Sequence, residues 1–195
     1  ITSLAAAPFD ELGRDEKLTL LINAYNAFTL RLICDYYPLK SIKDIPAAQR
    51  WDHVRWQVGR HKWSLNQIEH EQIRPKFAEP RIHFALVCAA IGCPPLRNEA
   101  FAADKLEQQL ESQTAYCHGR DKWFRYHPGG DTVYLTSLYD WYGDDFKQPA
   151  GSVLNYAARY SPALAEAIKA GRSLRVQWLD YDWRLNSQDN RDKGL

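Results

Sequence analysis

The chain has 195 residues, of which 45% are hydrophobic and 13% aromatic, so it is long enough to bury a sizeable core. Twenty-five basic residues against 24 acidic ones give a net charge of +1, with no block of like charge. That balance argues against a nucleic acid or an anionic membrane surface as partner. No stretch approaches the roughly 20 apolar residues of a membrane-spanning helix, so no integral membrane segment is expected. Without an internal repeat or linker, residues 1–195 are predicted to form a single domain.

The N-terminal part predicts one long helix followed by short strands. Residues 15–37 carry apolar side chains at a spacing of three or four, which indicates one buried helical face. Pro38 is expected to end this helix. Residues 51–63 place Trp and Val on either side of a glycine turn, which is typical of short strands.

A second helix is predicted to begin at Ser64, because Gln67 follows at the spacing of a capping box, and to end at Pro75. The next segment, RIHFALVCAAIGCPPL, holds two of the four cysteines. Its β-branched residues favour a buried strand over residues 81–88 that delivers Cys88 to its C-terminal end. A helix over FALVCAAIG is the alternative.

The C-terminal half mixes helices and strands. Residues 99–116 predict a helix, residues 123–136 a hairpin with two glycines in the turn, and residues 151–170 two short helices interrupted at Ser161. Residues 174–186 predict a closing strand and tail. Because helices and strands alternate irregularly, the fold class is expected to be α+β. The predicted architecture is a single compact domain with a central, mainly antiparallel sheet flanked by helices.

Two polar side chains occupy helix positions that are expected to be buried. Asn26 falls at the edge of the apolar face of the first helix. Glu69 lies four residues from both Leu65 and Ile73, inside the apolar arc of the second helix. A buried carboxylate needs a strong partner, which a structural ion pair or a functional site could supply. His70 projects to the flank of the same arc.

The cysteines are Cys34, Cys88, Cys93 and Cys117. Four are too few to staple a domain of this size, and the C-x4-C spacing is neither a zinc-ribbon nor a thioredoxin spacing. The redox compartment therefore stays open. His70, His83, Cys88 and Cys93 have the ligand types of a zinc site, but their spacing matches no common module. No metal or cofactor is predicted.

Five segments together resemble a known family. They are LINAYNAFTLRLICDYYPLKSIKDI, SLNQIEHEQIRP, PRIHFALVCAAIGCPPLR, DWYGDDF and LDYDWRLN, and they resemble, in order and over nearly the whole chain, the domain of unknown function 547. The resemblance assigns the family's motif residues to Asn23, Tyr25, Asn26, Glu69, His70, Cys88, Pro94 and Asp145. That family occurs as single-domain bacterial proteins and at the C-terminus of larger plant proteins.

The resemblance also carries expectations about the site and the location. In plant members Ser often stands at the position of Cys93, and the residue at His83 varies, which favours Cys88 and His70 as the functional pair. Many bacterial members are exported. Because this chain begins at Ile1 and has no Met, it is expected to be a processed chain, with a periplasmic or secreted location. A distant similarity to papain-like and transglutaminase-like enzymes would require circular permutation, because His precedes Cys.

The first functional hypothesis is a cysteine-dependent hydrolase or acyltransferase that acts on an amide or ester carbonyl of a peptide-like substrate. Cys88 would be the nucleophile and His70 its base. Glu69, Asp145 or Asn26 would orient the imidazole, and backbone N–H groups of residues 89–92 would stabilise the oxyanion.

The alternative is a peptide- or glycan-binding or scaffold module in which the same polar residues form a structural network. Binding contacts are expected from Asn23, Tyr25, His83 and Asp145. The distance from the Cys88 sulfur to an imidazole nitrogen separates the hypotheses. A value near 3–4 Å in an accessible cleft, roughly the reach of a hydrogen bond, favours chemistry.

Overall fold

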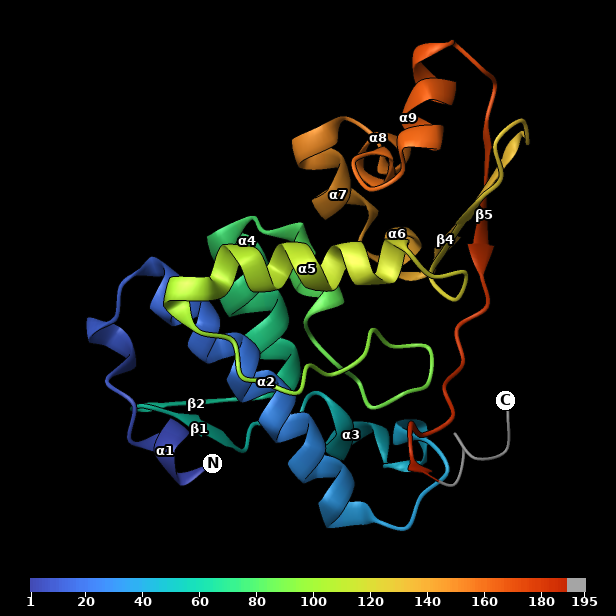
Figure 1. The fold of residues 1–195 in the computed structure, drawn as a ribbon. Coiled ribbons are helices and arrows are strands. Elements are labelled where there is room, and N and C mark those ends of the chain that lie inside the picture. The colour runs from blue at the N-terminus through green and yellow to red at the C-terminus, as the bar shows by residue number, and fades with distance from the viewer. Residues whose placement is uncertain (189–195) are drawn as a thin grey trace.

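The computed structural model describes residues 1–188 (Figure 1). The helices are α1 (Thr2–Ala5), α2 (Arg14–Tyr36), α3 (Ala47–Arg50), α4 (Arg74–Phe77), α5 (Leu106–His118), α6 (Leu138–Trp141), α7 (Gly143–Ala150), α8 (Val153–Ala158) and α9 (Pro162–Lys169). The strands are β1 (Trp56–Val58), β2 (His61–Trp63), β3 (Phe124–Tyr126), β4 (Thr132–Thr136) and β5 (Arg175–Leu179). Single 3-10 turns are η1 (Phe9–Glu11), η2 (Ile42–Asp44), η4 (Pro80–Phe84) and η5 (Ala103–Lys105), and η3 (Gln67–Ile73) is a π-helix.

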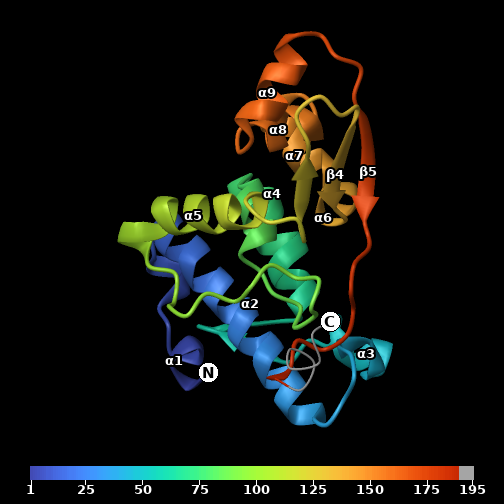
Figure 2. The same ribbon diagram turned by 45° about the vertical axis from the view of Figure 1, so that its right-hand side comes forward.

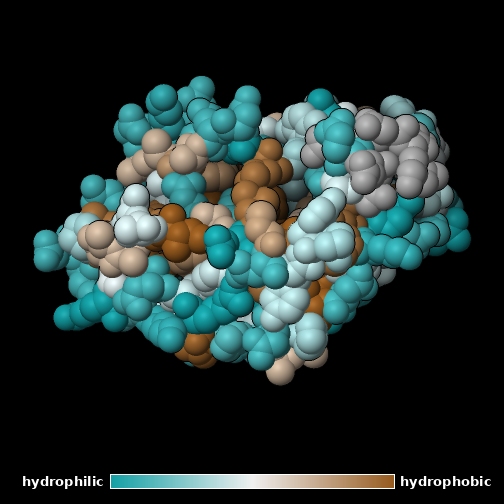
Figure 3. All heavy atoms as spheres, turned by 90° about the horizontal axis from the view of Figure 1, so that it is seen from below, coloured by the Kyte–Doolittle hydropathy of each residue, from teal (hydrophilic) through white to brown (hydrophobic). Residues whose placement is uncertain are grey.

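The molecule has two apolar cores. The first surrounds α2 and includes Phe28, which stacks on Trp56 of β1. The second lies among the last three strands and α6 to α9, around Tyr139 and Phe146. Helix α5 joins them, since Leu106 near its start packs in the first core and Cys117 near its end packs in the second. Seen from below, the surface is mostly hydrophilic, with apolar groups gathered near its middle (Figure 3).

The α+β class is confirmed, but the strands form two small sheets rather than one central sheet. Strands β1 and β2 pair antiparallel beside α2, and the second sheet has the order β3-β4-β5. Strand β5 pairs parallel to β4, because α6 to α9 lie between them in the chain and form a crossover. Among the described residues, no helix is both long and apolar enough to cross a membrane.

Several predicted elements are confirmed. Helix α2 ends at Tyr36, one residue before the predicted end and ahead of Pro38. Ser64 and Gln67 form the expected capping box, with reciprocal hydrogen bonds of 3.0 Å. The predicted hairpin is β3–β4, and helices α8 and α9 meet at Ser161, whose side chain caps α9.

The predicted helix end at Pro75 is wrong. The helix continues through this proline to Phe77, and Ala78 then adopts a left-handed conformation with φ of 49°. A wide π turn precedes the proline, in which the backbone N–H of Arg74 donates to the carbonyl of Glu69, five residues earlier. A proline is normally excluded from a helix interior because it cannot donate the regular hydrogen bond to the residue four positions earlier. The π turn interrupts this regular bonding, so the proline is tolerated here.

The predicted strand over residues 81–88 is also wrong, and so is the alternative helix. Pro80 opens the 3-10 turn η4, and the Glu79 side chain caps it by accepting from the backbone N–H of Arg81. A proline at the first helical position with an acidic cap favours a helical turn over an extended strand. Beyond the turn the chain is irregular, and Ala89 has a positive φ of 60°.

The predicted helix over residues 99–116 starts later, with η5 and then α5. Residues ahead of it are held instead by side chains. Gln109 accepts from the N–H of Ala102 and donates to the carbonyl of Ala100. Those bonds replace the helical bonds that residues 99–102 would otherwise make.

After β5, the chain runs back along the first core (Figure 2). The Ser41 hydroxyl donates to the carbonyl of Trp183 at 2.7 Å. The N–H groups of Ile91 and Gly92 donate to carbonyls of Arg184 and Asp182, both at 2.8 Å. This return places the aromatic residues of the tail beside the loop that follows Cys88.

A buried histidine makes stability depend on pH. The His118 Nδ1–H donates to the carbonyl of Thr114 at 2.8 Å, and Nε2 accepts from the Tyr139 hydroxyl at 2.7 Å. Burial lowers the pKa of His118 to about 4. Between pH 6.5 and pH 4 the imidazole is protonated in the unfolded chain but stays mostly neutral in the folded protein. We therefore expect the free energy of unfolding to fall by up to about 3 kcal/mol as the pH is lowered from 6.5 to 4. Urea unfolding across this range measures it.

The matched variant is His118→Gln, whose amide keeps a donor and an acceptor but does not titrate. Its unfolding free energy should fall less steeply with acid than that of the wild-type protein. The same slope in both proteins would show that His118 does not carry the effect.

Candidate functional site

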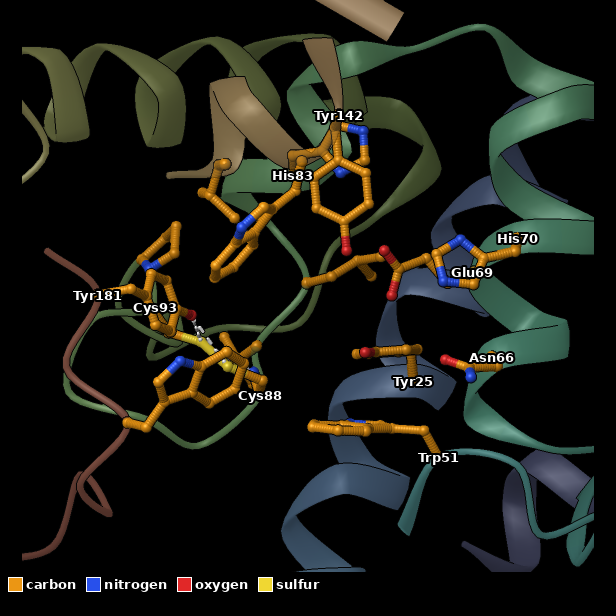
Figure 4. Close-up of a pocket in the computed structure, with 16 residues that line it drawn as sticks. Tyr25, Trp51, Asn66, Glu69, His70, His83, Cys88, Cys93, Tyr142 and Tyr181 are labelled. Atoms are coloured by element: carbon orange, nitrogen blue, oxygen red, sulfur yellow. Dashed lines mark hydrogen bonds between the residues drawn. A yellow bond between two sulfur atoms is a disulfide. The ribbon is translucent and has the colours of Figure 1, made fainter. Parts of the chain in front are cut away.

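A cavity of about 300 Å³ lies where α2, η3, the loop after η4, α6 and the C-terminal tail meet. It is shown in Figure 4, and its lining residues are Tyr25, Trp51, Asn66, Glu69, His70, His83, Leu86, Val87, Cys88, Cys93, Pro94, Leu138, Trp141, Tyr142, Tyr181 and Trp183. Tyr25 and Glu69 are buried at its base, whereas His70 and Trp141 are exposed at its rim. The cavity is therefore a pocket with a buried floor and an accessible edge.

Asn26 holds the segment that leads into Cys88. Its side-chain amide donates to the carbonyl of Ala85 at 3.0 Å, and its oxygen accepts from the N–H of Val87 at 2.9 Å. Asn26 therefore points toward the segment that leads into Cys88 and not into solvent. Asn26 is absent from the pocket lining, so it acts on the pocket through the backbone that it fixes.

Asn23 makes an equivalent clamp elsewhere. It donates to the carbonyl of Phe101 at 2.8 Å and accepts from the N–H of the same residue at 2.9 Å. This pair ties α2 to the chain ahead of α5. Asn23 does not line the cavity with Cys88 and Glu69, so its contacts are those of a fold-stabilising residue.

The carboxylate of Glu69 is buried at the pocket floor, as its helical phase predicts, with a relative exposure of 6%. Its neighbours include the phenols of Tyr25 and Tyr142, and the Tyr142 hydroxyl points toward it (Figure 4). Burial raises the pKa of both tyrosines above the usual value of 10.0, and the charge and hydrogen bonding of Glu69 add to the rise. Both phenols therefore stay protonated and can donate to the carboxylate.

Asp145 forms a network that supports one wall. The Arg74 guanidinium binds it through Nε at 2.7 Å and Nη2 at 3.1 Å, and His83 Nε2 lies 2.7 Å from its Oδ2. Although burial alone would raise it, the pKa of Asp145 is held well below its usual range by hydrogen bonds from His83 and Arg74. The ring of Tyr142 stacks on His83 at 3.9 Å, with Arg74 5.0 Å from the same ring. The network fixes the tyrosine that faces Glu69.

Cys88 and Cys93 form a disulfide at the side of the pocket opposite Glu69 (Figure 4). The Tyr181 hydroxyl lies 3.0 Å from both sulfurs, and the backbone N–H of Cys88 donates to the Cys93 sulfur at 3.0 Å. Cys88 is half-buried and Cys93 is buried. Burial raises the pKa of Tyr181, so its hydroxyl is a donor and not a base.

His70 does not reach Cys88 in this structure. Its Nδ1 lies 3.0 Å from Nη1 of Arg74. His70 and Cys88 lie on opposite sides of the pocket (Figure 4). Two of the N–H groups expected to form an oxyanion hole, those of Ile91 and Gly92, donate instead to the C-terminal tail. The structure therefore brings Glu69, His70, Tyr25, His83 and Cys88 to the lining of one cavity, but His70 and Cys88 lie on opposite sides of it.

Trp and Tyr side chains form the outer wall, and the sequence reasoning did not name these particular residues. Trp141 stacks on Trp183 at 5.7 Å, Tyr181 packs against Trp183 at 4.7 Å, and Trp51 meets Trp183 edge-on at 6.2 Å. The segments DWYGDDF and LDYDWRLN carried a local sign of this wall, because they place three and two aromatic residues, respectively, among acidic ones. The sequence does not show that the C-terminal tail returns to the pocket, and this return brings the two segments together. Within residues 1–188, no three His, Cys, Asp or Glu side chains are grouped to hold a metal.

The two asparagine clamps make a matched pair for mutation. We expect Asn26→Ala to lower the free energy of unfolding by about 2–4 kcal/mol, because it leaves a buried carbonyl and a buried N–H unpaired. Amide hydrogen exchange should rise at Val87 in this variant. In Asn23→Ala it should rise at Phe101 and stay unchanged at Val87. Unaltered exchange at Val87 in Asn26→Ala would contradict the clamp.

Comparison with known proteins bears on the N-terminal part of this site. Residues 9–116 match the family model described as "Protein of unknown function, DUF547". Neither curated proteins nor solved structures gave a match. The matched range, more than half of the chain, includes Glu69 and both pocket cysteines, whereas Trp141, Tyr181 and Trp183 lie beyond it. The chain belongs to the DUF547 family.

Proposed function

We propose that this protein binds a cationic group, an ammonium or a guanidinium, carried by a peptide-like ligand, and that Glu69 is its counter-ion. The observation that carries the proposal is a carboxylate without an ion pair at a pocket floor. Within the described residues, Glu69 makes no salt bridge, and the guanidinium of Arg74, five residues later in the chain, is engaged in two bonds with Asp145. A buried carboxylate is costly unless a cation or hydrogen-bond donors compensate it.

The aromatic wall supports a cationic ligand in particular. Indole and phenol rings attract cations through the negative face of the ring, most strongly in a desolvated site. The protein already uses one of these rings in this way, because Lys43 Nζ lies 3.7 Å from the ring centroid of Trp183. A ligand cation between Glu69 and the indoles would meet both a charge and π-faces.

The size of the pocket supports a small ligand group. At about 300 Å³ it lies at the lower end of small-molecule sites. That volume suits one lysine or arginine side chain with part of its backbone. The backbone polar groups of a peptide would meet the rim, where His70 and Asn66 lie.

A cysteine-dependent hydrolase or acyltransferase is the second candidate function, because the Cys88 sulfur lines the same cavity as Glu69. This activity needs a reduced Cys88 and a base beside it. In the present geometry the neighbours of the Cys88 sulfur are Cys93 and the Tyr181 hydroxyl, and the Nε2 of His83 is bound to Asp145. The thiol mechanism stays a prediction.

Isothermal titration calorimetry with two matched ligands tests the proposal. Nα-acetyl-lysine methylamide, with a free side-chain ammonium, should bind. Nα-acetyl-norleucine methylamide, which lacks only the ammonium, should bind at least roughly tenfold more weakly, since a hydrogen bond to a charged group is worth about 1.5–3 kcal/mol. Glu69→Gln, which keeps the shape of the side chain and removes its charge, should remove this discrimination.

The control is Glu71→Gln, which removes the same charge from an exposed position on the same helix. It should leave the affinity for the lysine ligand unchanged. Equal affinity for the two ligands in the wild-type protein, or equal losses in the two variants, would overturn the proposal.

A further inference from the structure

The disulfide at the pocket wall has two unlike sulfurs. Both cysteines line the cavity, but Cys93 is buried, with a relative exposure of 5%, whereas Cys88 is half-buried. The Cys93 sulfur accepts from the N–H of Cys88 and from the hydroxyl of Tyr181, both at 3.0 Å, and the Cys88 sulfur has Tyr181 as its hydrogen-bond partner. Cys88 is therefore the more exposed residue of the pair, and the Cys93 sulfur has one more hydrogen-bond donor.

We propose that this disulfide undergoes thiol–disulfide exchange with a small or peptide thiol that enters the pocket, and that Cys88 is the sulfur attacked. The incoming thiolate forms a bond to the Cys88 sulfur, the Cys88–Cys93 bond breaks, and Cys93 leaves as a thiolate. A second external thiolate then attacks the external sulfur of the mixed disulfide, so Cys88 leaves as a thiolate. The net change converts the protein disulfide to two thiols and two external thiols to one disulfide.

The direction of attack follows from access and from the leaving group. Exchange is faster when the attacked sulfur is accessible and when the departing thiol is a stabilised thiolate. The pocket gives access to Cys88, and the hydrogen bonds from Cys88 N–H and Tyr181 stabilise the charge that forms on Cys93. Burial raises the pKa of Tyr181, so its hydroxyl keeps the proton that it donates.

The other two cysteines of the chain lie outside this pair. Cys34 is exposed on α2, and Cys117 is buried in the second core, where burial raises the pKa of its thiol to about 12. Cys34→Ser is therefore a suitable background, because it removes the exposed thiol without touching the pocket. Cys117 is expected to stay unreactive in the folded state.

The experiment measures which sulfur exchanges. In the Cys34→Ser background, Cys93→Ser leaves Cys88 free, and Cys88→Ser leaves Cys93 free. Each folded variant is incubated with oxidised glutathione, and the mixed disulfide is followed by intact mass and peptide mapping. Cys88 should form it at least roughly tenfold faster than Cys93, because access controls exchange. Equal rates, or a faster Cys93, would overturn the assignment.

A second measurement uses the intact disulfide and does not depend on those variants. Reduced glutathione should open the disulfide of the folded Cys34→Ser protein, and Tyr181→Phe should slow this step roughly threefold or more, because the leaving thiolate loses a donor. A disulfide that opens only after urea unfolding would refute exchange in the native pocket. This outcome is separable from the proposed function, since lysine-ligand binding is measured without any thiol.

Discussion

The pocket depends on the interactions of the Asp145 carboxylate. It receives Arg74 from α4 and His83 from η4, while Asp145 itself lies on α7, so one charged group joins three separate segments. A bidentate guanidinium bond fixes direction as well as distance. Tyr142, three residues before Asp145, is thereby stacked on His83 with its hydroxyl toward Glu69. Together with α5 and the returning tail, this joint fixes the wall of the pocket that comes from the C-terminal half against the floor that comes from the N-terminal half.

The pocket combines two chemistries that the sequence hypotheses kept apart. Its floor offers a carboxylate with phenol donors, which suits recognition of a cation, and its side offers a disulfide in which Cys88 is the more exposed residue. The Asn26 clamp contributes to both, because it fixes the backbone immediately before Cys88. A site with a charged floor, an aromatic wall and a sulfur at its edge can bind a ligand and still leave thiol chemistry to the redox state of the pair.

Local patterns predicted the elements whose stability is local. The apolar spacing of α2, the capping box at Ser64 and the burial of Glu69 are confirmed because helix geometry and side-chain chemistry determine them directly. The strand expected at residues 81–88 is wrong because its β-branched residues compete with a proline and an acidic cap, and the cap prevails. The sequence alone could not show whether Cys88 and His70 meet, since the π turn and the Arg74–Asp145 bond decide where the imidazole of His70 lies. The aromatic wall depends on contacts between residues far apart in the chain, such as Ser41 with Trp183, and no local pattern predicts those.

The central claim is that Glu69 is the counter-ion of a bound cation. A crystal structure of the protein with Nα-acetyl-lysine methylamide tests it most directly, because it locates the ammonium. The account predicts the ammonium nitrogen within about 3–4 Å of a Glu69 carboxylate oxygen, the distance range of an ion pair, with the side chain against the indole of Trp51 or Trp183. An ammonium outside the cavity, or a ligand inside it with its methylene groups against Glu69 and its ammonium in solvent, would contradict the claim.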